Sequence, residues 1–117
     1  MVNAIRQGDV YWIDFGPATG SAPAERHPCV VVQSDLFNQS RILTTVICLI
    51  TSNLLRAEAP GNVPLAKGEA NLSKACVVNV SHILTVDKSE LLERIGRLPV
   101  AKSVALQKGL YLLLDRG

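Results

Sequence analysis

Three short segments of the sequence hold the side chains that are best suited to act on a phosphate group. Arginine offers a fixed, positively charged fork that matches phosphate oxygens, and histidine exchanges a proton near neutral pH. Hydroxyl and amide groups orient a bound ligand. Together these residue types suffice for metal-free phosphodiester chemistry, and they suffice equally for RNA binding without catalysis. The candidates are Glu25, Arg26 and His27 on a loop before Pro28, then Thr51, Ser52 and Asn53, and finally Ser81 and His82.

Each candidate also has an ordinary structural explanation. Arg26 fits a solvated loop charge, because charged side chains are common on protein surfaces. His27 fits a simple loop residue, and His82 fits a structural hydrogen-bond partner. Thr51 and Asn53 are typical of strand ends and turns. Residue chemistry alone therefore leaves the function open.

Strands are predicted on either side of these segments, so that the candidates stand at strand ends. Runs of β-branched apolar residues predict strands, and turn residues separate them. The longest run, Ile42–Ile50, is predicted to be central, whereas Pro64 makes Asn62–Leu65 an edge-like strand. Strand ends on one side of a small barrel can converge on one surface. The other predicted strands are Val10–Phe15, Cys29–Gln33, Ala75–Val80, Ile83–Val86 and Glu93–Leu98.

A single amphipathic helix is predicted at the end of the chain, over Val100–Leu114. Gly109 lowers its helix propensity and indicates close packing against the sheet. Many short strands followed by one helix predict a mainly β fold, a small barrel with a terminal helix. The apolar residues near one face of the helix are Val104, Leu110, Leu113 and Leu114.

Composition predicts one well-filled domain, residues 1–117. A length of 117 residues is typical of a single domain. Hydrophobic residues make up 48% of the chain and charged residues 19%, which argues against disorder. The net charge of +2 is compatible with a polyanionic ligand without requiring one. No phosphate loop, dinucleotide fingerprint or metal-ligand spacing is present, so no cofactor and no metal are expected.

The cysteines and the first residues of the chain predict a cytoplasmic location. Cys29, Cys48 and Cys76 each lie inside an apolar run, which predicts buried thiols in a reducing compartment. The segment MVNAIRQGDV lacks the apolar core of a signal peptide. A bilayer is spanned by about 20 consecutive apolar residues. No apolar run approaches that length, so no membrane association is expected.

Several motifs in a fixed order closely resemble the MazF/PemK/Kid family of toxin endoribonucleases. Gly8–Ser21 read G-D-V-Y-W-x-D-x-x-P-x-x-G-S, and Pro23–Asp35 read P-x-x-R-x-P-x-V-V-V-Q-S-D. Further matches are I-T-S-N at Ile50–Asn53, P-G-N-V at Pro60–Val63 and V-V-N-V at Val77–Val80. The resemblance runs nearly end to end and includes the terminal helix.

The resemblance implies a fold, an activity and partners. The family has an SH3-like barrel of the MazF/CcdB type, with additional strands and a C-terminal α-helix, and it works as a homodimer. It cuts single-stranded RNA at short specific sequences without a metal ion. The RNA 2′-hydroxyl attacks the adjacent phosphate, which leaves a 2′,3′-cyclic phosphate and a 5′-hydroxyl end. A cognate MazE-like antitoxin blocks the RNA groove.

The family motif can be carried over residue by residue. The family's essential Arg stands immediately before the loop Pro; here His27 occupies that position and Arg26 precedes it. Some members have Arg at both positions, so Arg26 matches the first and His27 replaces the second. The catalytic Thr or Ser after the central strand matches Thr51. On this basis we predict Arg26, Thr51 and His27 as catalytic residues, with His27 or, as a weaker candidate, Glu25 transferring protons. The predicted substrate-binding residues are Gly20, Ser21, Glu25, Ser52, Asn53, Ser81 and His82.

Two other functions compete with RNA cleavage. A CcdB-type toxin has the same fold and acts on gyrase, a protein target. A non-catalytic module on an SH3-like barrel would bind RNA or a peptide, and the presence of His27 in place of Arg keeps this alternative open. The Arg-x-Pro loop and the set Thr51–Asn53 favour the ribonuclease.

Overall fold

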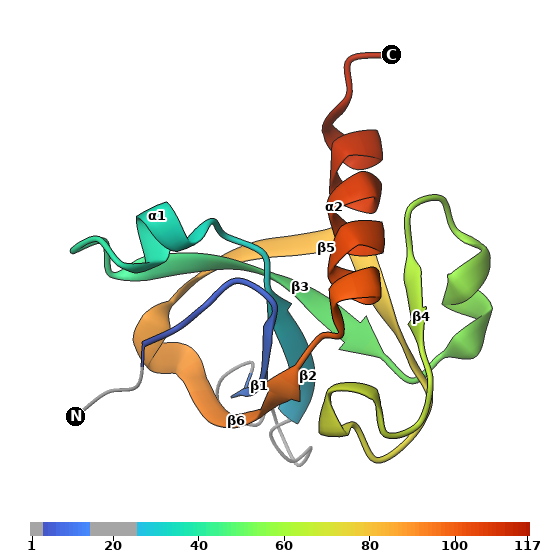
Figure 1. The fold of residues 1–117 in the computed structure, drawn as a ribbon, viewed down its shortest axis with the longest axis horizontal. Helices are drawn as coiled ribbons and strands as arrows, with labels where there is room; N and C mark the ends of the chain where they lie inside the picture. Colours follow the sequence, from blue (N-terminus) through green and yellow to red (C-terminus); the bar gives the residue numbers. More distant parts are fainter. Residues whose placement is uncertain (1–3, 15–25) are drawn as a thin grey trace, which may run out of the picture.

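The computed structural model describes residues 4–14 and 26–117, which form one antiparallel sheet and a long terminal helix (Figure 1). The strands follow the order β4-β5-β3-β2-β1-β6 across the sheet. In chain order the strands are β1 (Asp9–Asp14), β2 (Arg26–Val31), β3 (Thr44–Thr51), β4 (Val63–Leu65), β5 (Cys76–Asp87) and β6 (Leu91–Arg97). The helices are α1 (Asp35–Asn38) and α2 (Val100–Leu114), and the 3₁₀ turns are η1 (Leu54–Glu58), η2 (Glu69–Asn71) and η3 (Lys88–Glu90).

Strand β3 lies at the centre of the sheet, as its β-branched run predicts. It pairs with β2 on one side and with β5 on the other. The two predicted strands at Ala75–Val80 and Ile83–Val86 are one strand, β5, because its pairing with β3 continues on both sides of a bulge. Pro64 lies in β4, which is an edge strand of the sheet. An edge position is expected for proline because it has no backbone N–H to donate to a second neighbouring strand.

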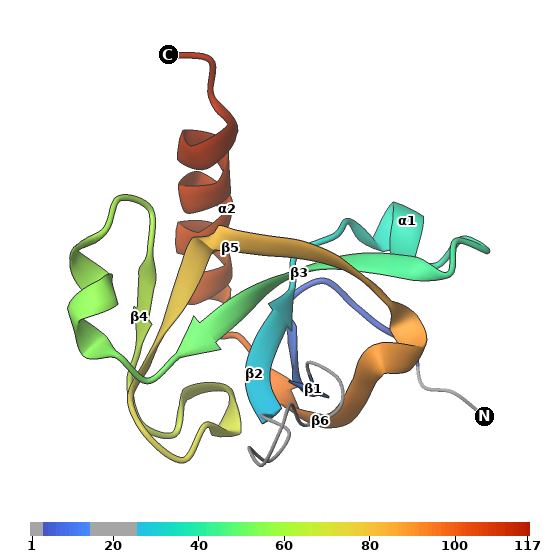
Figure 2. The same ribbon diagram turned by 180° about the vertical axis from the view of Figure 1, so that it is seen from behind.

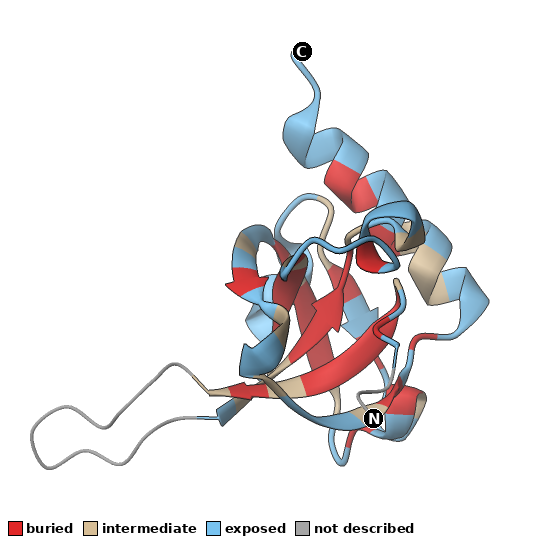
Figure 3. Ribbon diagram, turned by 90° about the vertical axis from the view of Figure 1, so that its left-hand side faces the viewer, coloured by how far each residue is buried: buried red, intermediate tan, exposed pale blue. Residues whose placement is uncertain are grey.

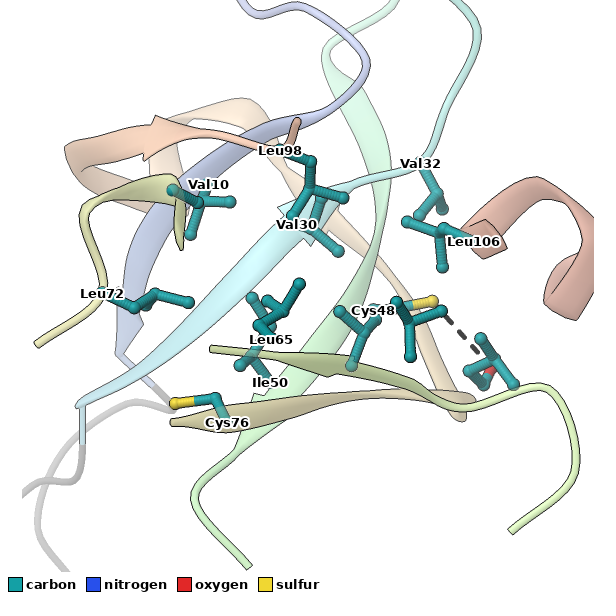
Figure 4. Packing of buried hydrophobic residues seen from close by; sticks show 14 of the residues in the cluster. Val10, Val30, Val32, Cys48, Ile50, Leu65, Leu72, Cys76, Leu98 and Leu106 are labelled. Carbon is teal, nitrogen blue, oxygen red and sulfur yellow. Dashed lines mark hydrogen bonds between the residues drawn. The ribbon is translucent and has the colours of Figure 1, made fainter. Parts of the chain in front are cut away.

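The sheet is buried on both faces because its strands carry apolar side chains at successive positions (Figure 3). One cluster contains Val10, Val30 and Ile50 and is closed by Leu106 of α2 (Figure 4). The opposite face carries a second cluster around Ile13, Cys29, Val31 and Ile47. This two-sided burial explains why the sequence of β1 does not alternate cleanly between apolar and polar residues.

The expectation of a closed barrel is wrong for the described residues, whose sheet has β4 and β6 as free edges. The turn η2 packs against β6 in the place where a closing strand would pair. Asn71 donates from Nδ2 to the carbonyl oxygen of Ile95 at 3.1 Å. A Cβ atom placed on Gly96 would come within 2.3 Å of the carbonyl oxygen of Ala70, so the two backbones touch directly. A mainly β sheet with one C-terminal helix is confirmed.

Helix α2 begins and ends where the sequence predicts and lies beside β4 and β5 (Figures 1 and 2). Gly109 does mark a close contact, but its neighbour is the turn at Gly61 and not the sheet: an added Cβ would meet the Gly61 carbonyl oxygen at 2.1 Å. The predicted apolar face is wrong in part: of its four residues only Leu110 is buried, together with Leu106, whereas Val104, Leu113 and Leu114 are exposed. The end of α2 projects past the sheet. Within the described ranges, no helix combines the length and apolar character needed to cross a membrane.

Candidate functional site

The first residues of β2 position the two central candidates. Arg26 and His27 belong to the strand and not to a loop, as their pairing with β1 shows: Arg26 lies opposite Asp14, and His27 lies opposite Ile13. Pairing with β3 starts only at Cys29, so Pro28 precedes the part of β2 that has a neighbour on both sides. The predicted residues Gly20, Ser21 and Glu25 lie outside the described residues.

A pocket of about 460 Å³ opens where β2 begins and β3 ends. It brings together Arg26, His27, Thr51 and Ser52 from the two predicted segments. The two segments meet because β2 and β3 are antiparallel neighbours, so the start of one lies beside the end of the other. The size is that of a small-ligand site. Four of the predicted residues therefore share one cavity.

Arg26 is held by two contacts and still reaches solvent. Its guanidinium carbon lies 5.7 Å from the ring centre of Trp12, which is a cation–π distance. Its Nη2 atom is 3.5 Å from Oε1 of Glu93, and its side chain is 47% exposed. Asp14 on β1 pairs with Arg26 in the sheet. Its Oδ1 atom is buried and accepts no hydrogen bond within the described part of the chain. Contacts with Trp12 and Glu93 thus orient the guanidinium at the pocket, and no ion pair between Arg26 and a buried carboxylate occurs among the described residues.

Arg26 and His27 leave opposite faces of the sheet, because side chains alternate along a strand. Arg26 shares its face with Trp12, which lies on the neighbouring strand beside Pro28. Extending the pairing of Cys29 with Leu49 by two residues puts His27 opposite Thr51. Both faces border the pocket since it lies at the ends of the strands. The candidate site therefore has an arginine side and a histidine–threonine side.

Thr51 and Asn53 are linked by a hydrogen bond but differ in role. The backbone N–H of Asn53 donates to Oγ1 of Thr51 at 3.1 Å, which orients the hydroxyl. Nothing in the described part of the chain accepts from the Thr51 O–H, so this group can donate to a phosphate oxygen. Asn53 caps η1 by accepting from the N–H of Leu55 at 3.2 Å, and it does not line the pocket. Its side chain has a structural function.

Ser81 and His82 are separated from the pocket along the sheet. They lie in the bulge of β5, where Leu49 pairs with Asn79 and the preceding Cys48 pairs with Ile83. The pocket touches only the other end of β5, at its first residue. Ser81 donates from Oγ to Oδ1 of Asn79 at 3.1 Å, and both predicted residues are exposed. The geometry does not join them to the candidates at Arg26 and Thr51.

Sequence reasoning missed one whole wall of the pocket. Asn71, Ser73 and Lys74 come from the segment between β4 and β5, and Trp12 comes from β1. Trp12 had a usable signal, since the pairing of β1 with β2 brings it to the face of Arg26. The segment 69–74 had none, because its place beside β6 depends on contacts between residues far apart in the chain.

The thiols take no part in the chemistry of the pocket. All three cysteines are free and buried, which confirms the prediction. Burial raises the pKa of Cys29 and of Cys48 to about 12, and it also raises the pKa of Cys76, against the opposing charge of Lys74. These groups stay protonated at neutral pH and are poor nucleophiles. The described residues also contain no cluster of three or more His, Cys, Asp or Glu side chains that could hold a metal ion.

Comparison with known proteins assigns the family. Residues 6–114 match the family described as PemK-like, MazF-like toxin of type II toxin-antitoxin system. The chain belongs to this toxin family. The endoribonuclease MazF6 of Mycobacterium tuberculosis is 41% identical over 111 residues, which are 95% of this chain and 97% of that protein. The endoribonuclease MazF of Staphylococcus epidermidis is 32% identical over 94% of this chain and 91% of its own.

Solved structures of the family share the fold of the toxin chain. A mycobacterial endoribonuclease in complex with its cognate antitoxin superposes with a TM-score of 0.79, at 22% identity, over 97% of this chain and 98% of that one. A MazE–MazF structure from Deinococcus radiodurans gives a TM-score of 0.78 at 21% identity, over 99% and 100% of the two chains. At this identity the likeness establishes the fold.

Proposed function

We propose that this toxin is an endoribonuclease that cuts single-stranded RNA at specific sequences without a metal ion. The 2′-oxygen attacks the adjacent phosphorus, the bond to the 5′-oxygen breaks, and the products carry a 2′,3′-cyclic phosphate and a 5′-hydroxyl. The observation that carries the proposal is the pocket at the strand ends, which collects Arg26, His27 and Thr51 around one cavity in a chain of this family. Its relatives at 41% and 32% identity are named endoribonucleases.

Arg26 stabilises the negative charge that builds up on the phosphate. Its guanidinium is oriented by the Trp12 ring and lines the pocket, so little reorganisation is needed when charge develops. The contact with Glu93 is exposed to solvent and weak, and a phosphate oxygen can replace it. A planar fork of donors fits two oxygens of one phosphate.

Thr51 and His27 act from the other face. The Thr51 hydroxyl, oriented by Asn53, donates to a phosphate oxygen or to the 2′-hydroxyl. His27 lies opposite Thr51 on the adjacent strand and on the same face of the sheet. It transfers protons to or from the reacting oxygens. Ser52 lines the pocket and contacts RNA. RNA contacts by Gly20, Ser21 and Glu25, and the weaker candidacy of Glu25 for proton transfer, remain predictions from the sequence.

The same proposal includes the partners and the compartment. A MazE-like antitoxin is the expected inhibitor, because two structural neighbours are toxin–antitoxin complexes. A homodimer is proposed as the working form; the exposed apolar side chains of Tyr111, Leu112 and Leu114 on the projecting end of α2 favour an association surface. RNA as substrate and three free thiols favour the cytoplasm.

Digestion of a long single-stranded RNA by the purified protein tests this function. We expect fragments with 5′-hydroxyl ends and 2′,3′-cyclic phosphates, produced at the same rate with and without a chelator. An Arg26→Ala preparation purified in parallel controls for contaminating nucleases. Absence of fragments, 5′-phosphate ends or inhibition by the chelator would each contradict the proposed chemistry. No observation favours a gyrase target or a non-catalytic binding module.

A further inference from the structure

The segment from Gly68 to Lys74 is fixed firmly against the rest of the fold. Ala70 and Asn71 have φ values of 53° and 60°, a left-handed conformation that is costly for residues other than glycine. The turn can pack directly against β6 because Gly96 has no side chain. The backbone of Gly96 lies against the carbonyl of Ala70, where an added Cβ would stand 2.3 Å away. The hydrogen bond from Asn71 to Ile95 joins the same turn to β6.

Helix α2 also holds the start of this segment. Lys102 places its Nζ 3.7 Å from Oε1 of Glu69 and donates to the carbonyl oxygen of Pro64 at 2.7 Å. Oε1 of Glu69 also accepts from the N–H of Ala66 at 2.7 Å. The segment is therefore held by β4, β6 and α2 together, and it behaves as a wall of the pocket that is ordered before any ligand binds.

This wall faces the cavity with both apolar and polar groups. Leu72 is buried, and with Ile50 and Ile95 it gives the pocket an apolar lining. Ser73 and Lys74 line the same pocket and are exposed. A flat nucleobase matches an apolar lining with hydrogen-bonding groups at its rim, whereas a phosphate gains nothing from the apolar part of that lining.

Lys74 is the group on this wall that can best discriminate between bases. Lys74 lines the pocket and is exposed, so its ammonium group can reach a ligand there. Lysine donates to the oxygen and nitrogen acceptors on a base edge, and guanine offers two such acceptors side by side. An amino group at the same place on a base would repel it.

We propose that the wall Gly68–Lys74 determines sequence specificity by holding one unpaired RNA base in the pocket beside Arg26, with Lys74 donating to acceptor atoms on that base. This inference rests on the proposed ribonuclease function and deepens it. Lys74 is a specificity residue and takes no part in bond cleavage. The base it favours carries a carbonyl oxygen at the contacted edge, as guanine and uracil do.

Sequencing of fragment ends tests this assignment. The toxin and its Lys74→Ala variant digest the same RNA of mixed sequence, and the base frequencies around each cut are compared. We expect the preference at one position next to the cut to fall by about tenfold or more in the variant, while the other positions keep theirs. Lys67→Ala is the matched control, because it removes the same charge from an exposed residue that does not line the pocket. It should leave every position unchanged.

The outcomes separate this inference from the proposed function. If the parent protein produces no fragments, the ribonuclease proposal fails and takes this inference with it. If the parent cuts selectively and Lys74→Ala keeps the same selectivity, only the inference fails. A variant that cuts all sequences equally more slowly, with a smaller salt dependence of binding, would show a phosphate contact in place of base recognition and would also overturn it. A thermal melt of each variant confirms that the fold is retained.

Discussion

Two arginine–carboxylate arrangements, one beside each end of strand β1, differ in burial. At its start, Asp9 is buried, with a side chain only 4% exposed, and its Oδ1 accepts from Arg97 at 2.9 Å and from Arg94 at 3.3 Å. At its other end, Arg26 lies 3.5 Å from Glu93, whose side chain is 81% exposed. The buried carboxylate has exchanged water for fixed donors, whereas the exposed pair keeps its hydration.

This difference in burial separates a structural ion pair from an arginine that can bind a ligand. The arginines around Asp9 join β1 to β6 and cannot leave without stranding a buried charge. Arg26 can exchange Glu93 for a phosphate at little cost, because an exposed ion pair contributes little free energy. We therefore expect substitutions at the Asp9 end to change stability and substitutions at the Arg26 end to change activity.

The largest effect is expected for Arg26→Ala. Loss of a preorganised donor to the reacting phosphate should lower kcat by about 10²–10³-fold, while the free energy of unfolding changes by less than about 0.5 kcal/mol. Single-turnover RNA cleavage and urea unfolding measure the two quantities. Arg41→Ala, which removes an exposed arginine outside the pocket, is the matched control. Cleavage at the parent's rate by Arg26→Ala would remove Arg26 from the site.

Asp9→Ala should produce the largest loss of stability. It leaves the N–H of Arg6 without the acceptor at 3.2 Å and two arginines without their shared carboxylate. We expect the free energy of unfolding to fall by about 2–3 kcal/mol, below the full cost of a wholly buried pair since both arginines are half exposed. Urea denaturation measures this, with Asp115→Ala as an exposed control. An unchanged midpoint would remove the contrast between the two ends of β1.

His27→Ala sharpens the division between the two faces of the site. A side chain that transfers protons contributes to the rate of the chemical step. We expect the variant to cut RNA about 10²-fold more slowly in single-turnover cleavage, with an unchanged melting curve. His82→Ala is the matched control, because His82 lies in the β5 bulge. A raised KM with an unchanged kcat would reduce His27 to a binding residue.

Glu93→Gln should have the smallest effect. Removing a carboxylate that competes with phosphate for Arg26 should lower KM for RNA by no more than about fivefold, and the free energy of unfolding should change by less than about 0.5 kcal/mol. Steady-state cleavage at low salt measures the change. If kcat instead falls more than about tenfold, Glu93 positions Arg26 and the pair is not exchangeable.

Local sequence patterns determined the elements and part of the site. The β-branched run of β3 predicted the central strand, and the segment after Pro99 predicted the bounds of α2, though not which of its apolar residues are buried. Family motifs directed attention to Arg26 and Thr51, which do share a pocket. These features were readable because propensity and motif spacing involve residues close together in the chain.

Only the tertiary structure decided how these elements meet. The wall at Gly68–Lys74 is placed by contacts with β6 and α2, among them that of Ala70 with Gly96, which no local pattern indicates. Strand register, which long-range pairing sets, determines that Arg26 and His27 lie on opposite faces of the sheet. The same pairing places Ser81 and His82 in the bulge of β5, far along the sheet from the pocket. Sequence therefore determined which residues are available for chemistry, whereas packing between distant residues decided which of them stand together.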